Sequence, residues 1–179
     1  MEHNIDWLVT GYGNFLEKFG LDKAGVRTHY HEWQDKTGRE DVHDYLWYLF
    51  QVILGETNKQ VKDPLDLQKN LHEIYTAMWY FGTQVEGRKA TDLQQLVMDT
   101  RVRVWQLELP CYFRVKLMAS NCCPYCDHLD GQLFSPEDML QHQSFSLAKC
   151  TNDEGCACFF APVVDRDGNN QLIQKTQTN

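Results

Sequence analysis

The chain has 179 residues, of which 42% are hydrophobic and 23% are charged, and its formal net charge at pH 7 is −8. The sequence shows no basic patch or stripe, which disfavours direct binding to DNA or RNA, because Lys and Arg contacts to phosphate supply most of that affinity. Residues 1–20 lack a signal-peptide pattern, and the longest apolar run, Tyr45 to Phe50, is too short to span a bilayer. We therefore expect no membrane segment and a reducing compartment, in which paired cysteines more often bind metal than form disulfides.

The N-terminal part of the chain carries apolar residues at helical spacing. A first helix is expected over residues 5–19, with Gly20 at its end. Residues 21–40 are mixed and polar, and we interpret them as a solvated amphipathic segment. A second helix is expected from Asp41, whose side chain can cap it, to Gly55, a residue type that suits a helix end.

Two further helices have clearer start signals. The first begins with Asp63 as the N-cap and Pro64 at the first helical position, and an apolar stripe follows. The second begins at Thr91, which forms a capping-box pattern with Gln94, and it ends at Pro110.

The hydrophobic period changes after the last of these helices. Residues 111–117 alternate between apolar and polar, which predicts a strand with one buried face, and residues 132–134 can return as its partner. Residues 158–164 predict a further strand. The sequence therefore indicates an α+β protein with three parts: a helical domain over residues 1–110, a small β-rich zinc-binding module over residues 111–164, and a flexible tail over residues 165–179.

The cysteines are concentrated in the predicted β-rich module. Six of the seven lie between positions 122 and 158. Cys123 and Cys126 enclose Pro-Tyr, a spacing that suits a tight metal-binding knuckle, and Cys156 and Cys158 can share one face of a strand. Two such pairs suit tetrahedral zinc, which favours thiolate ligands. Disulfides and scattered buried thiols are the alternatives, and zinc is favoured over them because two spaced pairs are a strong signal.

The predicted ligands of one structural Zn²⁺ are Cys123, Cys126, Cys156 and Cys158. Cys122 is expected to point away from the ion, because neighbouring side chains in extended backbone diverge. Cys150 is the main rival for a ligand position, since it lies in a polar loop that could swing toward the site. The thiols that we expect not to bind the ion are Cys111, Cys122 and Cys150. Weaker rivals for a ligand position are Asp153 and His142.

The first cysteine pair belongs to a longer motif. The stretch from Cys123 to Phe134 reads CPYCDHLDGQLF. It resembles the C-P-x-C-x-x-L-D-G-x-x-F signature of the minor head proteins of tailed phages, which are the head-morphogenesis proteins similar to protein F of phage Mu. That family has a second segment near H-P-x-C-R-C; here Asp153 stands in place of its His and Ala157 in place of its Arg. The resemblance covers residues 110–164.

The resemblance implies both a fold and a role. The implied fold is a helical N-terminal part followed by a β-rich zinc module. The implied role is that of a minor capsid protein in phage or prophage head morphogenesis, acting through protein–protein contacts with a portal or other capsid protein. The implied location is the virion or the cytoplasm of a bacterial host, and the motif leaves the oligomeric state open.

A zinc-dependent enzyme and a nucleic-acid-binding zinc module are the alternative functions. His31-Glu32 and His72-Glu73 each lack the second His of H-E-x-x-H, and no His is followed by x-Glu as in zinc deaminases. His128, beside the first cysteine pair, is the base candidate that is left, and we interpret it as a surface residue. A closed four-thiolate site has no position for water or substrate, so we expect no enzymatic activity.

Overall fold

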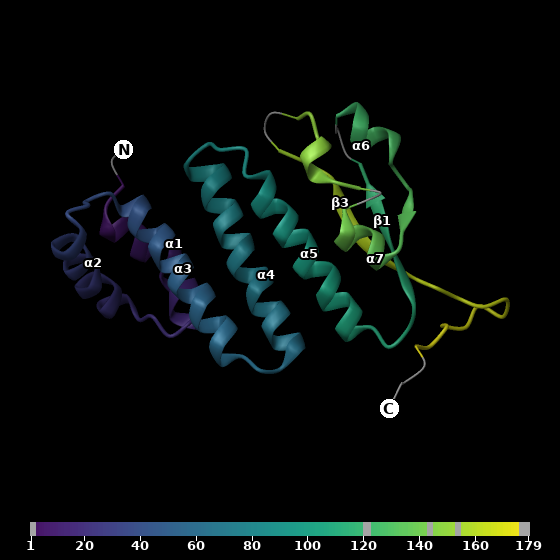
Figure 1. Cartoon of the computed structure of the whole chain (residues 1–179), viewed down its shortest axis with the longest axis horizontal. Helices are drawn as coiled ribbons and strands as arrows, with labels where there is room; N and C mark the ends of the chain where they lie inside the picture. Colours follow the sequence, from purple (N-terminus) through teal and green to yellow (C-terminus); the bar gives the residue numbers. More distant parts are fainter. Residues whose placement is uncertain (1–2, 120–122, 143–144, 153–154, 176–179) are drawn as a thin grey trace. The chain divides into compact units, whose positions relative to one another are not determined.

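The computed structural model describes residues 3–119, 123–142, 145–152 and 155–175 (Figure 1). The chain divides into two compact units, Met1–Lys59 and Gln60–Asn179. Its long helices come first and a small antiparallel sheet follows near the C-terminus, so the predicted α+β class with a helical N-terminal part is confirmed. Among the described helices, none combines the length and the apolar character that crossing a membrane requires.

Three helices form the first unit: α1 (Ile5–Lys18), α2 (Lys23–Thr37) and α3 (Val42–Gln60). The Asn4 side chain caps α1 and the Asp22 side chain caps α2, in each case by accepting hydrogen bonds from two backbone N–H groups. Gly38 ends α2 in the left-handed conformation, with a φ of 67°. The buried Tyr45 hydroxyl donates to the Val26 carbonyl oxygen at 3.0 Å and so links α3 to α2.

Two expectations for this unit need correction. The segment interpreted as solvated is helix α2, and one of its faces is buried through Val26, Tyr30 and Trp33. The helix α3 runs past Gly55, where we expected it to end. A single Gly inside a helix costs about 1 kcal/mol, and the burial of neighbours such as Ile53 offsets that cost.

The second unit begins with an antiparallel helix pair. The helix α4 (Pro64–Tyr80) continues into a short π-helix, η1 (Phe81–Val85), and α5 (Thr91–Glu108) follows. Asp63 accepts from the Asp66 N–H at 2.9 Å, which confirms the predicted start of α4. Lys69, near the start of α4, pairs with Glu108, at the end of α5, with 2.6 Å between Nζ and Oε1.

The sheet has three antiparallel strands in the order β2-β1-β3, with β1 at Phe113–Met118, β2 at Leu133–Phe134 and β3 at Phe159–Val164. Val115 lies opposite Phe134 on one side and opposite Pro162 on the other. Three short helices occupy the connections: α6 (Pro124–His128), α7 (Pro136–Gln141) and the 3-10 turn η2 (Leu147–Lys149). The three predicted strands are therefore present.

One hydrophobic core joins α5, the sheet and the cysteines. Met98, Val102 and Trp105 on α5 pack in the same cluster as Val115 and Leu117 on β1, and the buried cysteines belong to that cluster. The sequence predicts a domain boundary after residue 110. In the structure α4 and α5 share a compact unit with the sheet, because the inner face of α5 supplies part of the core under it.

The segment expected to be a flexible tail is tied to the rest of the second unit as far as residue 175. Gln174 forms a backbone bridge with Cys111, and Arg166 forms one with Leu172. The Lys175 ammonium donates to two carbonyl oxygens at the end of α5, at 2.7 and 2.8 Å. These bonds hold residues 165–175 against the helix end in place of a free tail.

Candidate metal centre

Five buried cysteines from three segments meet beside the sheet. Cys123 and Cys126 flank the start of α6, Cys150 follows η2, and Cys156 and Cys158 precede β3. Each of the five is at most 8% exposed. Ala157, between the last two, is exposed, so the alternation expected of this pair is present although both cysteines lie just outside the strand.

The distances between the sulfur atoms suit a metal ion. The Cys123 Sγ lies 3.6 Å from that of Cys126 and 3.8 Å from that of Cys150, and the Sγ atoms of Cys126 and Cys156 are 3.7 Å apart. Four sulfurs placed tetrahedrally at about 2.3 Å from one ion would be about 3.8 Å apart. Two overlapping groups, one of Cys123, Cys126 and Cys150 and one of Cys126, Cys156 and Cys158, each have all sulfurs within 4.8 Å. The cluster could therefore hold a metal ion, and Cys126 is common to both groups.

The loop around the first pair is fixed by residues that no metal requires. Pro124 occupies the first turn of α6, directly after Cys123. The Asp130 carboxylate accepts from the Ala119 N–H at 2.7 Å, which ties the turn after α6 to the end of β1. Gly131 has a φ of 74°, a conformation that favours glycine, and its N–H donates to the carbonyl oxygen of Leu117 on β1 at 2.9 Å. The Leu-Asp-Gly part of the motif thus positions the knuckle against the sheet.

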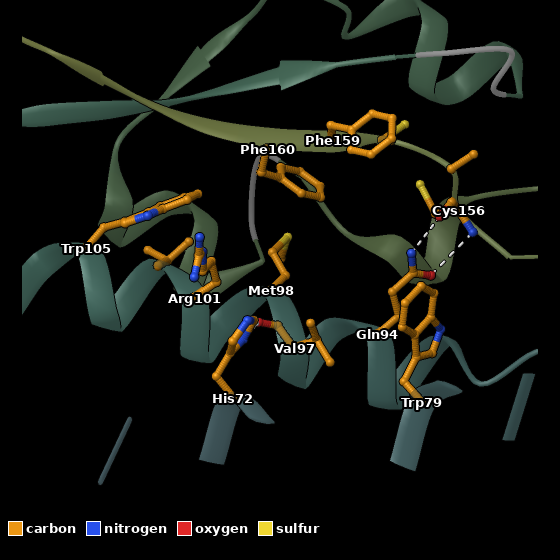
Figure 2. Close-up of a pocket in the computed structure, with 13 residues that line it drawn as sticks. His72, Trp79, Gln94, Val97, Met98, Arg101, Trp105, Cys156, Phe159 and Phe160 are labelled. Atoms are coloured by element: carbon orange, nitrogen blue, oxygen red, sulfur yellow. Dashed lines mark hydrogen bonds between the residues drawn. The ribbon is translucent and has the colours of Figure 1, made fainter. Parts of the chain in front are cut away.

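The second pair is held by a side chain from α5. The Gln94 Nε2 group donates to the Cys156 carbonyl oxygen at 2.6 Å, and its Oε1 accepts from the Cys156 N–H at 3.3 Å (Figure 2). The predicted capping box of Thr91 and Gln94 is wrong. The N-cap of α5 is Ala90, without a side-chain cap bond. Nothing in the local pattern indicates a contact between Gln94 and a residue so distant in the chain.

Cys150 is anchored in a similar way. The Lys89 ammonium donates to the Cys150 carbonyl oxygen at 3.1 Å. The backbone N–H of the next residue, Thr151, lies 3.4 Å from the Cys123 sulfur and donates to it. Cys150, in the polar loop that was expected to be free to swing, is therefore held in place, with its thiol inside the cluster.

The thiols differ in how readily they ionise without a metal. Burial by itself raises the pKa of Cys123, but N–H groups of Cys126 and Thr151 donate to its sulfur and lower that pKa to about 6. Burial raises the pKa of both Cys126 and Cys150 above the ordinary range, and the charge of neighbouring Cys156 adds to the rise. A bound divalent cation would lower the raised pKa of a coordinating thiol, because its positive charge favours loss of the thiol proton.

The four predicted ligands and Cys150 fall into two overlapping groups of sulfurs, with Cys123 in one group and the pair Cys156 and Cys158 in the other. Cys111 is buried elsewhere, just before β1. His142 bonds to the Asp99 carboxylate, with Nε2 3.0 Å from Oδ2, and His128 is exposed, as expected. Cys122 and Asp153 lie outside the described residues. The choice of four ligands among the five clustered thiols stays a prediction.

The fold and the site together define a class of protein: an α+β chain whose small antiparallel sheet carries a buried cysteine cluster able to hold a metal ion. Comparison with known proteins finds no matching family model, no similar curated protein and no similar solved structure.

Proposed function

We propose that the cysteine cluster binds one zinc ion and that this ion is structural. The observation that supports this most directly is the spacing of buried sulfurs, 3.6 to 3.8 Å along the path Cys150–Cys123–Cys126–Cys156. An all-sulfur donor set favours soft or borderline metals, and zinc is the one that takes a closed tetrahedron of thiolates without redox chemistry. Because the proposed ligands come from two segments that are distant in the chain, the ion would hold those segments together.

The proposed ligand set is Cys123, Cys126, Cys156 and Cys158, with Cys150 as the competitor for the fourth position. Cys126 belongs to both groups of converging sulfurs. Cys123 and Cys156 each lie within 3.7 Å of it. The fourth ligand is then Cys158, which shares a group with Cys126 and Cys156, unless Cys150 takes that position.

We further propose that the chain acts through protein–protein contacts, as a phage or prophage head-morphogenesis protein bound to a portal or other capsid protein. The support is that motif residues beyond the thiols have structural partners: Asp130 bonds to Ala119, Gly131 bonds to β1, and Phe134 is buried in the core. The resemblance to minor head proteins thus extends to residues that shape the site. The proposed location is the virion or the cytoplasm of a bacterial host.

Two measurements test these proposals separately. Elemental analysis of protein purified without added metal should give one zinc per chain; a metal-free protein with disulfides among the five thiols would contradict the zinc site. A pull-down with purified tailed-phage portal protein as bait should retain the zinc-loaded chain. If the zinc-loaded protein binds neither portal nor capsid protein, the zinc site would still be supported but the head-assembly role would be contradicted.

A further inference from the structure

A cavity of about 400 Å³ lies in the second unit, between the helix pair α4–α5 and the segment that leads into β3 (Figure 2). Its size falls within the range of about 300–1,000 Å³ that is typical of small-molecule sites. Neither the predicted metal centre nor the proposed head-assembly role uses this cavity. It shares one wall with the metal centre, since Cys156, Ala157 and Cys158 line it.

Most of the lining is apolar and much of it is aromatic. Trp79 comes from α4, Met98 and Trp105 from α5, and Phe160 from β3. Met98 and Trp105 are held in the core, so these side chains do not have to rearrange to present their surfaces. Flat aromatic walls of this kind suit a flat apolar body.

One cation lines the cavity without a partner of opposite charge. The Arg101 guanidinium lies over the Trp105 ring, 5.5 Å from its centroid, and Arg101 is exposed. Within the described part of the chain, Arg101 has no carboxylate at ion-pairing distance. In a protein with a net charge of −8, an unpaired Arg beside an apolar cavity favours an anionic group on whatever binds there.

His72 supplies a second polar group on the α4 side. Its Nδ1 lies 3.1 Å from the Val97 carbonyl oxygen, and because a carbonyl only accepts, Nδ1 carries the proton and donates. Burial lowers the pKa of His72, the hydrogen bond to Val97 partly opposes that shift, and the nearby Arg101 charge adds to it. The imidazole is therefore neutral at pH 7, which leaves Nε2 able to accept a hydrogen bond from a ligand hydroxyl or amine.

We propose that this cavity binds a small amphipathic organic anion, with a flat apolar body against Trp79, Trp105 and Phe160 and a carboxylate or sulfonate at Arg101. The class of ligand follows from the lining: an apolar slot, one unpaired cation and one neutral acceptor. The wall formed by Cys156 to Cys158 is positioned by Gln94, and the proposed zinc ion would add to that support. Any effect of zinc on ligand binding therefore rests on the proposed zinc site. The cavity itself and the Arg101 charge do not depend on that proposal.

Two fluorescent dyes with the same ring system test the proposal. Anilinonaphthalene sulfonate is an aromatic anion, and N-phenylnaphthylamine is its neutral counterpart. Zinc-loaded wild-type protein should bind both dyes. Arg101→Met keeps the aliphatic stem and removes the charge, so it should weaken binding of the anion about fivefold and leave the neutral dye unchanged. Arg103→Met removes an exposed charge two positions away and is the matched control, which should change neither.

A second variant tests the location. Val97→Phe adds bulk to a lining residue and should weaken binding of both dyes, with circular dichroism confirming that the variant is folded. Equal affinity of the anion for Arg101→Met and Arg103→Met would overturn the proposal, and so would a folded Val97→Phe protein that binds both dyes like wild type. Arg101-dependent dye binding by protein that holds no zinc as purified would support the cavity and contradict the zinc site.

Discussion

Replacing Cys126 with Ser should remove most of the zinc affinity, whichever thiol provides the fourth ligand. Cys126 is fully buried and belongs to both groups of converging sulfurs. Structural zinc in small domains is bound with an apparent free energy of about 10–16 kcal/mol, so one of four ligands accounts for about 3 kcal/mol. The expected loss of affinity is therefore about 100-fold. The matched control is Cys111→Ser, which changes another buried cysteine outside the cluster.

The assay is competition for zinc against a coloured chelator, with each variant first shown to be folded by circular dichroism. Wild type and Cys111→Ser should withdraw zinc from the chelator equally well. Cys126→Ser should lose this ability at chelator concentrations that leave wild type loaded. Equal zinc retention by Cys126→Ser and Cys111→Ser would refute the argument, because it would show that the convergent sulfurs do not bind the ion.

Further predictions concern the fourth ligand, the support of the site, its pH dependence and its local effect. Cys158→Ser should release zinc into the chelator and Cys150→Ser should retain it; the reverse result would make Cys150 the ligand. Gln94→Ala should lower the free energy of unfolding of the zinc-loaded protein by about 1–2 kcal/mol in urea titrations, because it leaves the Cys156 backbone groups without their partner. The control Gln51→Ala, at an exposed position, should change the free energy of unfolding little. Zinc affinity should rise with pH, because burial raises the pKa of Cys126 and zinc binding must therefore expel its proton. A pH-independent affinity would contradict thiolate ligation. Chelation should increase hydrogen exchange within residues 111–164 and leave the first unit protected; uniform loss of protection would show one cooperative unit.

Local signals in the sequence were sufficient for most of the elements. Asp63 followed by Pro64 predicts the start of α4, and the cap bond to Asp66 confirms it. The alternation of Phe113, Val115 and Leu117 predicts a strand with one buried face, and these three side chains are buried. Such signals are reliable because they depend on hydrogen bonds and periodicity within a few residues.

Contacts between distant segments could not be predicted in the same way. The capping-box assignment of Gln94 failed because a partner 62 positions away, Cys156, competes for its amide and is invisible to a local pattern. Cys150 was expected as a rival ligand in a loop free to swing, and its fixed position inside the cluster could not be predicted because it depends on the bond from Lys89. The helix α2 was missed for a related reason. Its composition is mostly polar, and its narrow apolar face stabilises a helix only when it packs on other helices.

The helix α5 connects the features of the second unit that bear on function. Its Gln94 fixes the backbone of the second cysteine pair, its Met98 lies in the core beside the cysteines, and its Arg101 supplies the cation of the cavity. Loss of the proposed zinc ion should therefore affect the cavity through Gln94 and the segment that leads into β3. No described residue of the first unit lines the cavity or joins the thiols. Because the wall from Cys156 to Cys158 is irregular backbone, loss of zinc would leave Gln94 as its main local support. Ligand affinity should then fall before helix α5 itself unfolds.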